Sequence, residues 1–244
     1  MSSPTETDNP SGAPAQPAKK ESLLANLLLN IIIPTLILSK LSSDEYLGTK
    51  WAIVVALAFP LGYGLKDLIS NSKINFYSAL GIISILLTGG IGLLELDAEY
   101  MAIKEAAIPG ILGLATVGSL YTRWPLVRTF VYNDKVFATE KIAAGLAFKG
   151  TEAAFERTLT VASWMIAGSF FLSSMLNYGL AKYILQSPPG TVAFNEELAK
   201  MTALSYPVIV LPSMIVFAAA LFYLIRRLTS LTGLSFEEML EHHK

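Results

Sequence analysis

The sequence predicts an all-α fold: a polytopic membrane helical bundle with six transmembrane helices and both termini in the cytoplasm. Composition is the first reason for this prediction. Of the 244 residues, 53% are hydrophobic and only 15% are charged, and the mean hydropathy is +0.52. A soluble domain usually carries about 25% charged residues, so this chain cannot cover its surface with polar groups. The other reasons are the grouping of apolar residues into blocks and the uneven distribution of lysine and arginine.

Six apolar blocks contain no Asp, Glu, Lys, Arg or His: 22–39, 51–65, 74–94, 106–122, 158–181 and 201–225. A spanning helix needs roughly 20 mostly apolar residues, and five blocks meet this requirement. The second block is short, but the long side chains of Lys50 and Lys66 can reach the membrane surface, so a span over 50–69 is expected. The first block lacks a small-residue cleavage site after it, so we expect it to be retained rather than removed as a signal peptide.

The basic residues predict the orientation. If the connections between six helices alternate between the two sides of a membrane, 13 of the 18 basic residues fall on the side of the termini. Lysine and arginine favour the cytoplasmic side, so both termini are expected there. The expected organisation is a disordered cytoplasmic tail over 1–20, a transmembrane domain over 21–230 with a cytoplasmic loop over 123–157, and a short cytoplasmic helix and tail over 231–244.

The cytoplasmic segments leave one question open. The apolar residues of 134–155 alternate with Lys and Glu, which is compatible with an interfacial helix in the lipid headgroups or with a helix packed on the bundle. Ser235 and Glu238 form a capping-box pattern that predicts the short C-terminal helix. His242 and His243 lack a third ligand nearby in the sequence, so a solvated tail is expected there rather than a metal site.

An acidic hairpin is predicted between the third and fourth helices. The segment "TGGIGLLELDAEYMAIKEAAIPG" (88–110) contains four carboxylates, Glu95, Asp97, Glu99 and Glu105, and one cation, Lys104. We expect the third helix to end near Leu94 and the fourth to begin near Ala106, with Pro109 in its first turn and the charges at the outer water boundary. Gly89, Gly90 and Gly92 would allow another helix to approach the third helix closely.

The chemistry inside the blocks is sparse. Ion-coupled transporters generally need an ionisable group at depth, and the blocks contain none. Asn26, Asn30 and Asn177 are compatible with interhelical hydrogen bonds or with a polar solute path. We find no nucleophile, phosphate-loop or zinc motif and no cysteine, so no catalytic residue, cofactor site or metal site is predicted. The net charge of −1 gives no reason to expect a nucleic-acid partner.

Several segments carry a resemblance to a known family: "KINFYSALGIISILLTGGIGLLELDAEYMAIKEAAIPG", "RWPLVRTFVYNDKVF", "ERTLTVASWMIAGSFFLSSMLNYGLAKYIL" and "FYLIRRL". Over about residues 23–228 the chain resembles the intracellular septation protein A family of bacterial inner-membrane proteins. By this resemblance the family's recurrent positions fall on Gly89, Gly90, Glu99, Lys104, Pro125, Leu126, Trp164 and Asn177.

The resemblance implies a non-catalytic role in cell-envelope maintenance, division or septation at the bacterial inner membrane. That role would be carried out through contacts with other envelope or division membrane proteins, with the lipid bilayer as surroundings and homo-oligomerisation left open. The candidate contact or packing residues are Gly89, Gly90, Asp97, Glu99, Lys104 and Asn177. The hairpin 95–105 and the basic loop 123–157 would be the contact surfaces.

Two other classes of protein stay open. The first is a small transporter or channel for a neutral or hydrophobic solute, whose path would include Asn26, Asn30, Pro60 and Asp67, because proline and glycine could break helices two and six. The second is a membrane-embedded enzyme acting on lipid-linked substrates through the outer carboxylates. It would need two acids at a fixed separation, which a sequence does not reveal.

Overall fold

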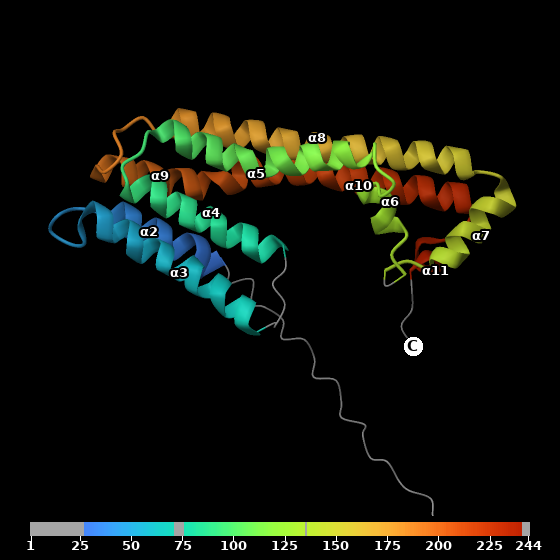
Figure 1. The fold of residues 1–244 in the computed structure, drawn as a ribbon, viewed down its shortest axis with the longest axis horizontal. Coiled ribbons are helices and arrows are strands. Elements are labelled where there is room, and N and C mark those ends of the chain that lie inside the picture. Colours follow the sequence, from blue (N-terminus) through green and yellow to red (C-terminus); the bar gives the residue numbers. More distant parts are fainter. Residues whose placement is uncertain (1–26, 71–75, 135, 241–244) are drawn as a thin grey trace, which may run out of the picture.

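The computed structural model describes residues 27–70, 76–134 and 136–240, and these residues fold into helices joined by short connections (Figure 1). In this part of the chain the β-structure is limited to one isolated bridge between Phe137 and Leu240. The all-α prediction is therefore confirmed. The expected tail over 1–20, Asn26, and His242 and His243 lie outside the described residues.

The helices follow one another as η1 (Leu28–Ile32), α2 (Ile33–Lys40), α3 (Gly48–Ser70), α4 (Phe76–Leu93), α5 (Ala98–Ser119), α6 (Leu126–Val131), α7 (Thr139–Lys149), α8 (Glu152–Ile184), α9 (Val192–Ser205), η2 (Tyr206–Val210), α10 (Leu211–Thr232) and α11 (Phe236–Met239). The elements η1 and η2 are single π-helical turns, and each continues directly into the next α-helix.

The fold is elongated. Helices α5, α8 and α9–η2–α10 run side by side along its length, α2, α3 and α4 pack against one end of this row, and α6, α7 and α11 lie at the other end (Figure 1). The connections 41–47, 94–97 and 185–191 gather at the first end, which we call the loop end. At the opposite end, α6, α7 and α11 with the adjoining parts of α8 and α10 form what we call the α7 module.

Four helical segments are long and apolar enough to cross a membrane: Gly48–Lys66, Ala98–Ser119, Glu152–Ile184 and Val192–Thr232. Two further apolar helices are shorter over the described residues, Leu28–Lys40 and Leu80–Leu93. The six helices of the prediction are therefore present, and four of them have spanning length. The second span, expected over 50–69, agrees with α3.

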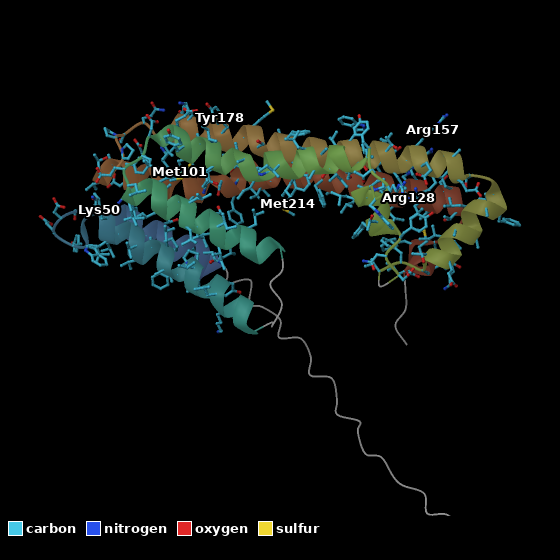
Figure 2. The ribbon with its side chains drawn as sticks, in the orientation of Figure 1. Lys50, Met101, Arg128, Arg157, Tyr178 and Met214 are labelled. Atoms are coloured by element: carbon cyan, nitrogen blue, oxygen red, sulfur yellow. The ribbon has the colours of Figure 1, made fainter. Side chains whose placement is uncertain are left out.

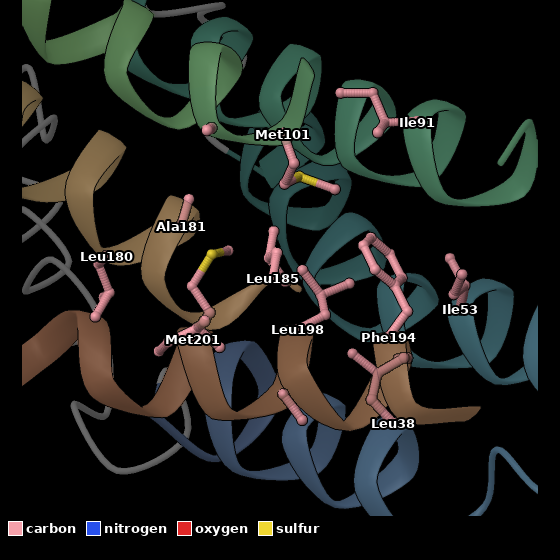
Figure 3. Close-up of a cluster of buried hydrophobic side chains, with 14 of the residues drawn as sticks. Leu38, Ile53, Ile91, Met101, Leu180, Ala181, Leu185, Phe194, Leu198 and Met201 are labelled. Carbon is pink, nitrogen blue, oxygen red and sulfur yellow. The ribbon is translucent and has the colours of Figure 1, made fainter. Parts of the chain in front are cut away.

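Each end of the molecule has its own hydrophobic core. The larger core lies near the loop end, where side chains such as Met101, Phe194 and Leu198 from α5 and α9 meet Leu38 and Ile53 of α2 and α3 (Figure 3). The second core fills the α7 module and is built around Phe155, Ile142, Leu146, Leu228 and Met239. Between the two cores, large apolar side chains such as Ile111, Leu114 and Ile215 are exposed.

The segment 123–157, predicted as a cytoplasmic loop with one helix in it, is more helical than expected. Helices α6 and α7 occupy much of it, and α8 begins at Glu152 rather than near residue 158. At about 1.5 Å per residue, the 33 residues of α8 are about 50 Å long and exceed the roughly 30 Å of a bilayer core. Charged residues such as Glu156 and Arg157 therefore continue a long helix and do not mark its end.

Helix α7 packs on the protein. Ile142 and Leu146 are fully buried in the second core, and a Cβ on Gly145 would lie 3.0 Å from the backbone oxygen of Thr232 in α10. Of the two interpretations of 134–155, the packed helix is confirmed for α7. Ser235 and Glu238 form the expected capping box at the start of α11, and the backbone amide of Ser235 holds the pKa of the Glu238 carboxyl below its usual range.

The proline-rich segments stay helical. Pro60 lies inside a continuous α3, and the π-helical turns η1 and η2 immediately precede Pro34 and Pro212. A proline has no amide hydrogen to donate to the carbonyl four residues earlier, and a wider turn accommodates the changed hydrogen-bond pattern. Helix six is therefore locally widened at its prolines, whereas an unwound segment had been considered.

Of the glycines at positions 89, 90 and 92 of α4, two face α3. A Cβ on Gly89 would lie 3.1 Å from Leu57 Cδ1, and one on Gly92 would lie 2.9 Å from Ile53 Cδ1. These two positions support the predicted close approach of another helix. A Cβ on Gly90 would meet nothing within 4 Å, so close packing does not explain the glycine there.

Candidate functional site

The loop end is braced by ion pairs and hydrogen bonds between its connections. Lys50 at the start of α3 lies 3.0 Å from Glu95 Oε1 in the α4–α5 turn. Glu95 adopts a positive φ of 54°, and its side chain lies so close to Gly190 that a Cβ there would be 2.7 Å from Glu95 Cδ. Gly190 itself has a φ of 81°, so both its conformation and its surroundings require glycine. These contacts bring the three connections together.

Glu99 joins the first turn of α5 to the end of α8. Its carboxylate accepts a hydrogen bond of 2.7 Å from the Tyr178 hydroxyl and forms an ion pair with Lys182. Tyr178 and Lys182 are four residues apart and therefore lie on one face of α8. The sequence predicted Glu99 as a candidate contact or helix-packing residue. The structure shows that Glu99 links two helices of the same chain, because its partners lie 79 and 83 positions away in the sequence.

The α8–α9 connection is held from α9. Glu197 accepts hydrogen bonds of 2.9 Å from the backbone amides of Gln186 and Ser187 and one of 2.7 Å from the Ser187 hydroxyl. Asn195 is fully buried, and its amide nitrogen donates to Ser42 Oγ at 3.0 Å and to the Thr49 carbonyl at 2.9 Å. Helix α9 thereby fixes both the α8–α9 and the α2–α3 connections.

A pocket of about 370 Å³ opens between these braces. Its walls come from the start of α5, the end of α8 and the segment that follows it, and they include Asp97, Glu99, Lys182, Gln186 and Pro188. Asp97 Oδ1 accepts a hydrogen bond of 2.7 Å from the Glu99 amide and caps α5. The predicted role of Asp97 at the outer turn is thus partly structural, because its side chain defines where the helix begins.

Lys104 is buried inside a helix, whereas the sequence prediction placed it in the turn before that helix. Helix α5 begins at Ala98, eight residues earlier than expected, so Lys104 is two turns inside the helix and only 8% exposed. Its Nζ lies 2.6 Å from Glu105 Oε1, 2.8 Å from Thr88 Oγ1 and 3.5 Å from Ser84 Oγ. Pro109 is likewise inside the helix rather than in its first turn.

This cluster links α5 to α4. Thr88 donates its hydroxyl hydrogen to the Ser84 carbonyl within α4 and accepts from Lys104. Helix α5 packs more extensively on α8 than on α4, and Lys104 provides a polar link from α5 to α4. Uncharged apolar blocks had suggested no ionisable group at depth, but α5 carries Lys104 and Glu105 within a segment of spanning length.

Asn177 is bonded within its own helix. Its amide nitrogen donates to the Ser173 carbonyl at 2.8 Å and to Ser173 Oγ at 3.4 Å. The expected interhelical hydrogen bond is instead made nearby by Ser174, whose hydroxyl donates to the Ala106 carbonyl of α5 at 2.8 Å.

The residues of the alternative solute path lie apart along the chain. Asn30 is in η1, Pro60 is in the middle of α3, and Asp67 is in the last turn of α3, while Asn26 is outside the described residues.

Exposed aromatic side chains cluster at two levels along the long helices. On α5 and the turn after it, Tyr100 and Tyr121 are 21 positions apart, which corresponds to about 32 Å of helix. On α8, Trp164 and Tyr183 are 19 positions apart, or about 29 Å. The level near the loop end also includes Trp51, and the level near the α7 module includes Trp124. We call these two levels the outer and inner aromatic levels.

Comparisons with known protein families, with curated proteins and with solved structures found no match for this chain. The resemblance to the intracellular septation protein A family therefore stays a prediction from motifs.

Sequence reasoning missed several residues of the loop end. Asn195, Glu197 and Lys182 fall between the apolar blocks 158–181 and 201–225 and had no predicted role, because the sequence does not show which residues they contact in the fold. A weak signal was present in the four-residue spacing of Tyr178 and Lys182, which puts a hydroxyl and a cation on one helix face. Nothing in that spacing identifies Glu99 as their partner.

Proposed function

We propose that this chain is a multi-pass protein of the bacterial inner membrane that acts, without catalysis, in cell-envelope maintenance or septation through protein contacts at its loop end. The braced loop end is the observation on which this proposal depends. The proposal also holds that six helices cross the membrane and that both termini are cytoplasmic.

The two aromatic levels support a position for the bilayer. Tyrosine and tryptophan gather at the two membrane–water interfaces, and the hydrocarbon core between them is about 30 Å thick. The spacings of about 32 and 29 Å on α5 and α8 match this thickness. The band between the levels contains the exposed apolar side chains of α5, α8 and α10, and Met214, labelled midway along the molecule in Figure 2, is one of them.

Chain direction supports six crossings. Helices α2, α4 and α8 run toward the loop end, and α3, α5 and α9–α10 run away from it (Figure 1). The first apolar block, 22–39, extends beyond Leu28–Lys40 into residues outside the description, and the third block, 74–94, includes the part of α4 before Leu80. With those residues each block reaches spanning length.

Charge supports the orientation. The α7 module and the helix ends beside it carry many cations, including Arg123, Arg128, Arg157, Arg226 and Arg227, and such residues favour the cytoplasmic side. The loop end carries acids such as Asp44, Glu45, Glu95 and Glu196. The loop end therefore faces outward in this proposal.

The braced loop end is suited to binding a partner protein. The ion pairs Lys50–Glu95 and Lys182–Glu99 fix the connections before any partner binds, which lowers the entropy lost on binding. Beside them Tyr46, Leu94 and Tyr183 are strongly exposed. Tyrosine is enriched where proteins contact each other, so these side chains with the neighbouring acids form a candidate contact surface.

Site-specific crosslinking tests this proposal, because the chain has no cysteine of its own. A cysteine at Tyr183, which is 81% exposed at the loop end, is expected to capture an envelope or division protein that mass spectrometry identifies. Adding Glu99→Gln should weaken the capture several-fold because the brace to Lys182 is lost. A cysteine at Phe148, 91% exposed on α7, is the matched control. Capture of the same proteins from both positions, or of none from Tyr183, would contradict the proposal.

A further inference from the structure

Two adjoining pockets open where α5 ends and α6 begins. One, of about 450 Å³, is lined by Arg123, Trp124, Pro125, Arg128, Thr129 and Tyr132. The other, of about 280 Å³, shares Arg123, Pro125 and Arg128 and extends to Glu156 and Thr160 of α8. Two guanidinium groups therefore border both pockets, and the first pocket has no acidic residue in its lining.

The two arginines have N–H hydrogen-bond donors that a ligand could use. Arg128 has a single carboxylate contact, between its Nη2 and Glu156 Oε1 at 3.4 Å, and its guanidinium lies 5.6 Å from the centre of the Tyr132 ring. A guanidinium has five N–H donors, so most of those of Arg128 are available. Arg123 is exposed and forms no ion pair or side-chain hydrogen bond with the described residues.

Hydrogen bonds fix the turn that carries Arg123 and Trp124. The backbone amide of Trp124 donates to Thr122 Oγ1 at 3.1 Å, and the Thr122 hydroxyl donates to the Ser119 carbonyl at 2.8 Å. The amide of Leu126 donates at 3.0 Å to the buried Ser119 hydroxyl. The backbone beneath both side chains is therefore set before any ligand arrives.

The two pockets also lie close to the inner aromatic level. Trp124 belongs to the inner aromatic level, and Thr160 in the second pocket lies one helical turn beyond Trp164 of the same level. With the bilayer at the position proposed above, on which this inference rests, the pockets lie just outside the hydrocarbon band, at the depth of lipid headgroups. Arginine binds phosphate oxygens in a forked geometry, and cations at this depth attract anionic lipid.

We infer that the first pocket binds the phosphate group of an anionic phospholipid headgroup. Arg123 and Arg128 would hold the phosphate oxygens, the Thr129 and Tyr132 hydroxyls border the same space, and Trp124 lies beside them at the membrane surface. Burial raises the pKa of Tyr132, so its hydroxyl keeps its proton and can donate a hydrogen bond. Glu156 would repel a phosphate from the second pocket, which favours the first.

The test counts lipids bound to the purified full-length protein in a neutral detergent by native mass spectrometry. The probes are phosphatidylglycerol and diacylglycerol, which differ in the phosphoglycerol headgroup. We expect Arg123→Gln to lower the affinity for phosphatidylglycerol about five-fold and the Arg123→Gln/Arg128→Gln pair to lower it more than ten-fold. Diacylglycerol binding should not change. Arg226→Gln/Arg227→Gln removes the same charge from exposed positions outside the pocket and should change the affinity less than two-fold.

One further variant separates forked binding by arginine from the effect of charge alone, and one competitor separates a lipid headgroup from free phosphate. Arg123→Lys should bind with intermediate affinity, because the charge is kept and the fork is lost. Inorganic phosphate at millimolar concentration should not displace the lipid if the headgroup is the ligand, whereas displacement that depends on Arg123 would identify free phosphate as the ligand and overturn the lipid assignment. Equal losses in the pocket pair and in the Arg226/Arg227 pair would overturn the site, as would unchanged binding in Arg123→Gln. Circular dichroism confirms that each variant is folded.

Discussion

Replacing Phe155 with alanine is expected to lower the free energy of unfolding of the α7 module by about 3–5 kcal/mol. Phe155 is 1% exposed, packs edge-on against Tyr132 at a ring distance of 6.0 Å, and belongs to the core that α7, α8, α10 and α11 share. Truncation would leave a cavity at the centre of that core. Thermal unfolding in detergent, followed with limited proteolysis of residues 123–157, measures the effect.

Phe148→Ala is the matched control for this prediction. Phe148 is on the same segment but is 91% exposed, so its truncation should change the stability by no more than about 0.5 kcal/mol. Equal and small effects of the two substitutions would mean that 123–157 has no packed core and would favour the interfacial helix that the sequence also allowed.

Replacing Lys104 with methionine is expected to destabilise the protein by about 2–3 kcal/mol. Removing one partner of a fully buried ion pair costs about 3–5 kcal/mol, and the figure here is lower because the Glu105 side chain is 28% exposed. Glu105 and Thr88 would each lose the lysine ammonium that they contact. The midpoint of thermal unfolding in detergent, compared with that of the unmodified protein, measures the loss.

Two companion variants test whether the burial of the Lys104–Glu105 pair is the reason for the expected loss of stability. Lys104→Met with Glu105→Gln should recover part of the stability, because no unpaired carboxylate is left. Lys50→Met removes an exposed ion pair to Glu95 and should cost less than about 1 kcal/mol. If Lys104→Met costs no more than Lys50→Met, Lys104 lies at the water boundary where the sequence had placed it.

The all-α class and the positions of the long apolar helices were predictable because they depend on composition along the chain. The second span illustrates this, since an apolar block between Lys50 and Lys66 predicted most of α3. The ends of helices were predicted less well where a charged residue was taken to mark the end of a helix. Lys104 and Glu105 lie inside α5, and Glu152, Glu156 and Arg157 begin α8, because a helix can bury a paired charge or continue into water.

The braces of the loop end could not be predicted, because they join residues far apart in sequence. Asn195 donates to Ser42 across 153 positions, and Glu99 pairs with Lys182 across 83. A helical pattern specifies which residues share a face but not which helix that face meets. The same reason explains Gly190, whose requirement for glycine comes from the Glu95 side chain of another connection.

In the proposed topology the band between the two aromatic levels lies in a membrane, with the loop end outside and the α7 module inside. Single cysteines at Tyr46, Met214 and Phe148, all exposed in the structure, test it with an impermeant maleimide on spheroplasts before and after permeabilisation. We expect Tyr46→Cys to react in intact spheroplasts, Phe148→Cys to react only after permeabilisation, and Met214→Cys to resist labelling in both. Reaction of Phe148→Cys in intact spheroplasts, or of Met214→Cys as readily as the other two, would contradict this claim.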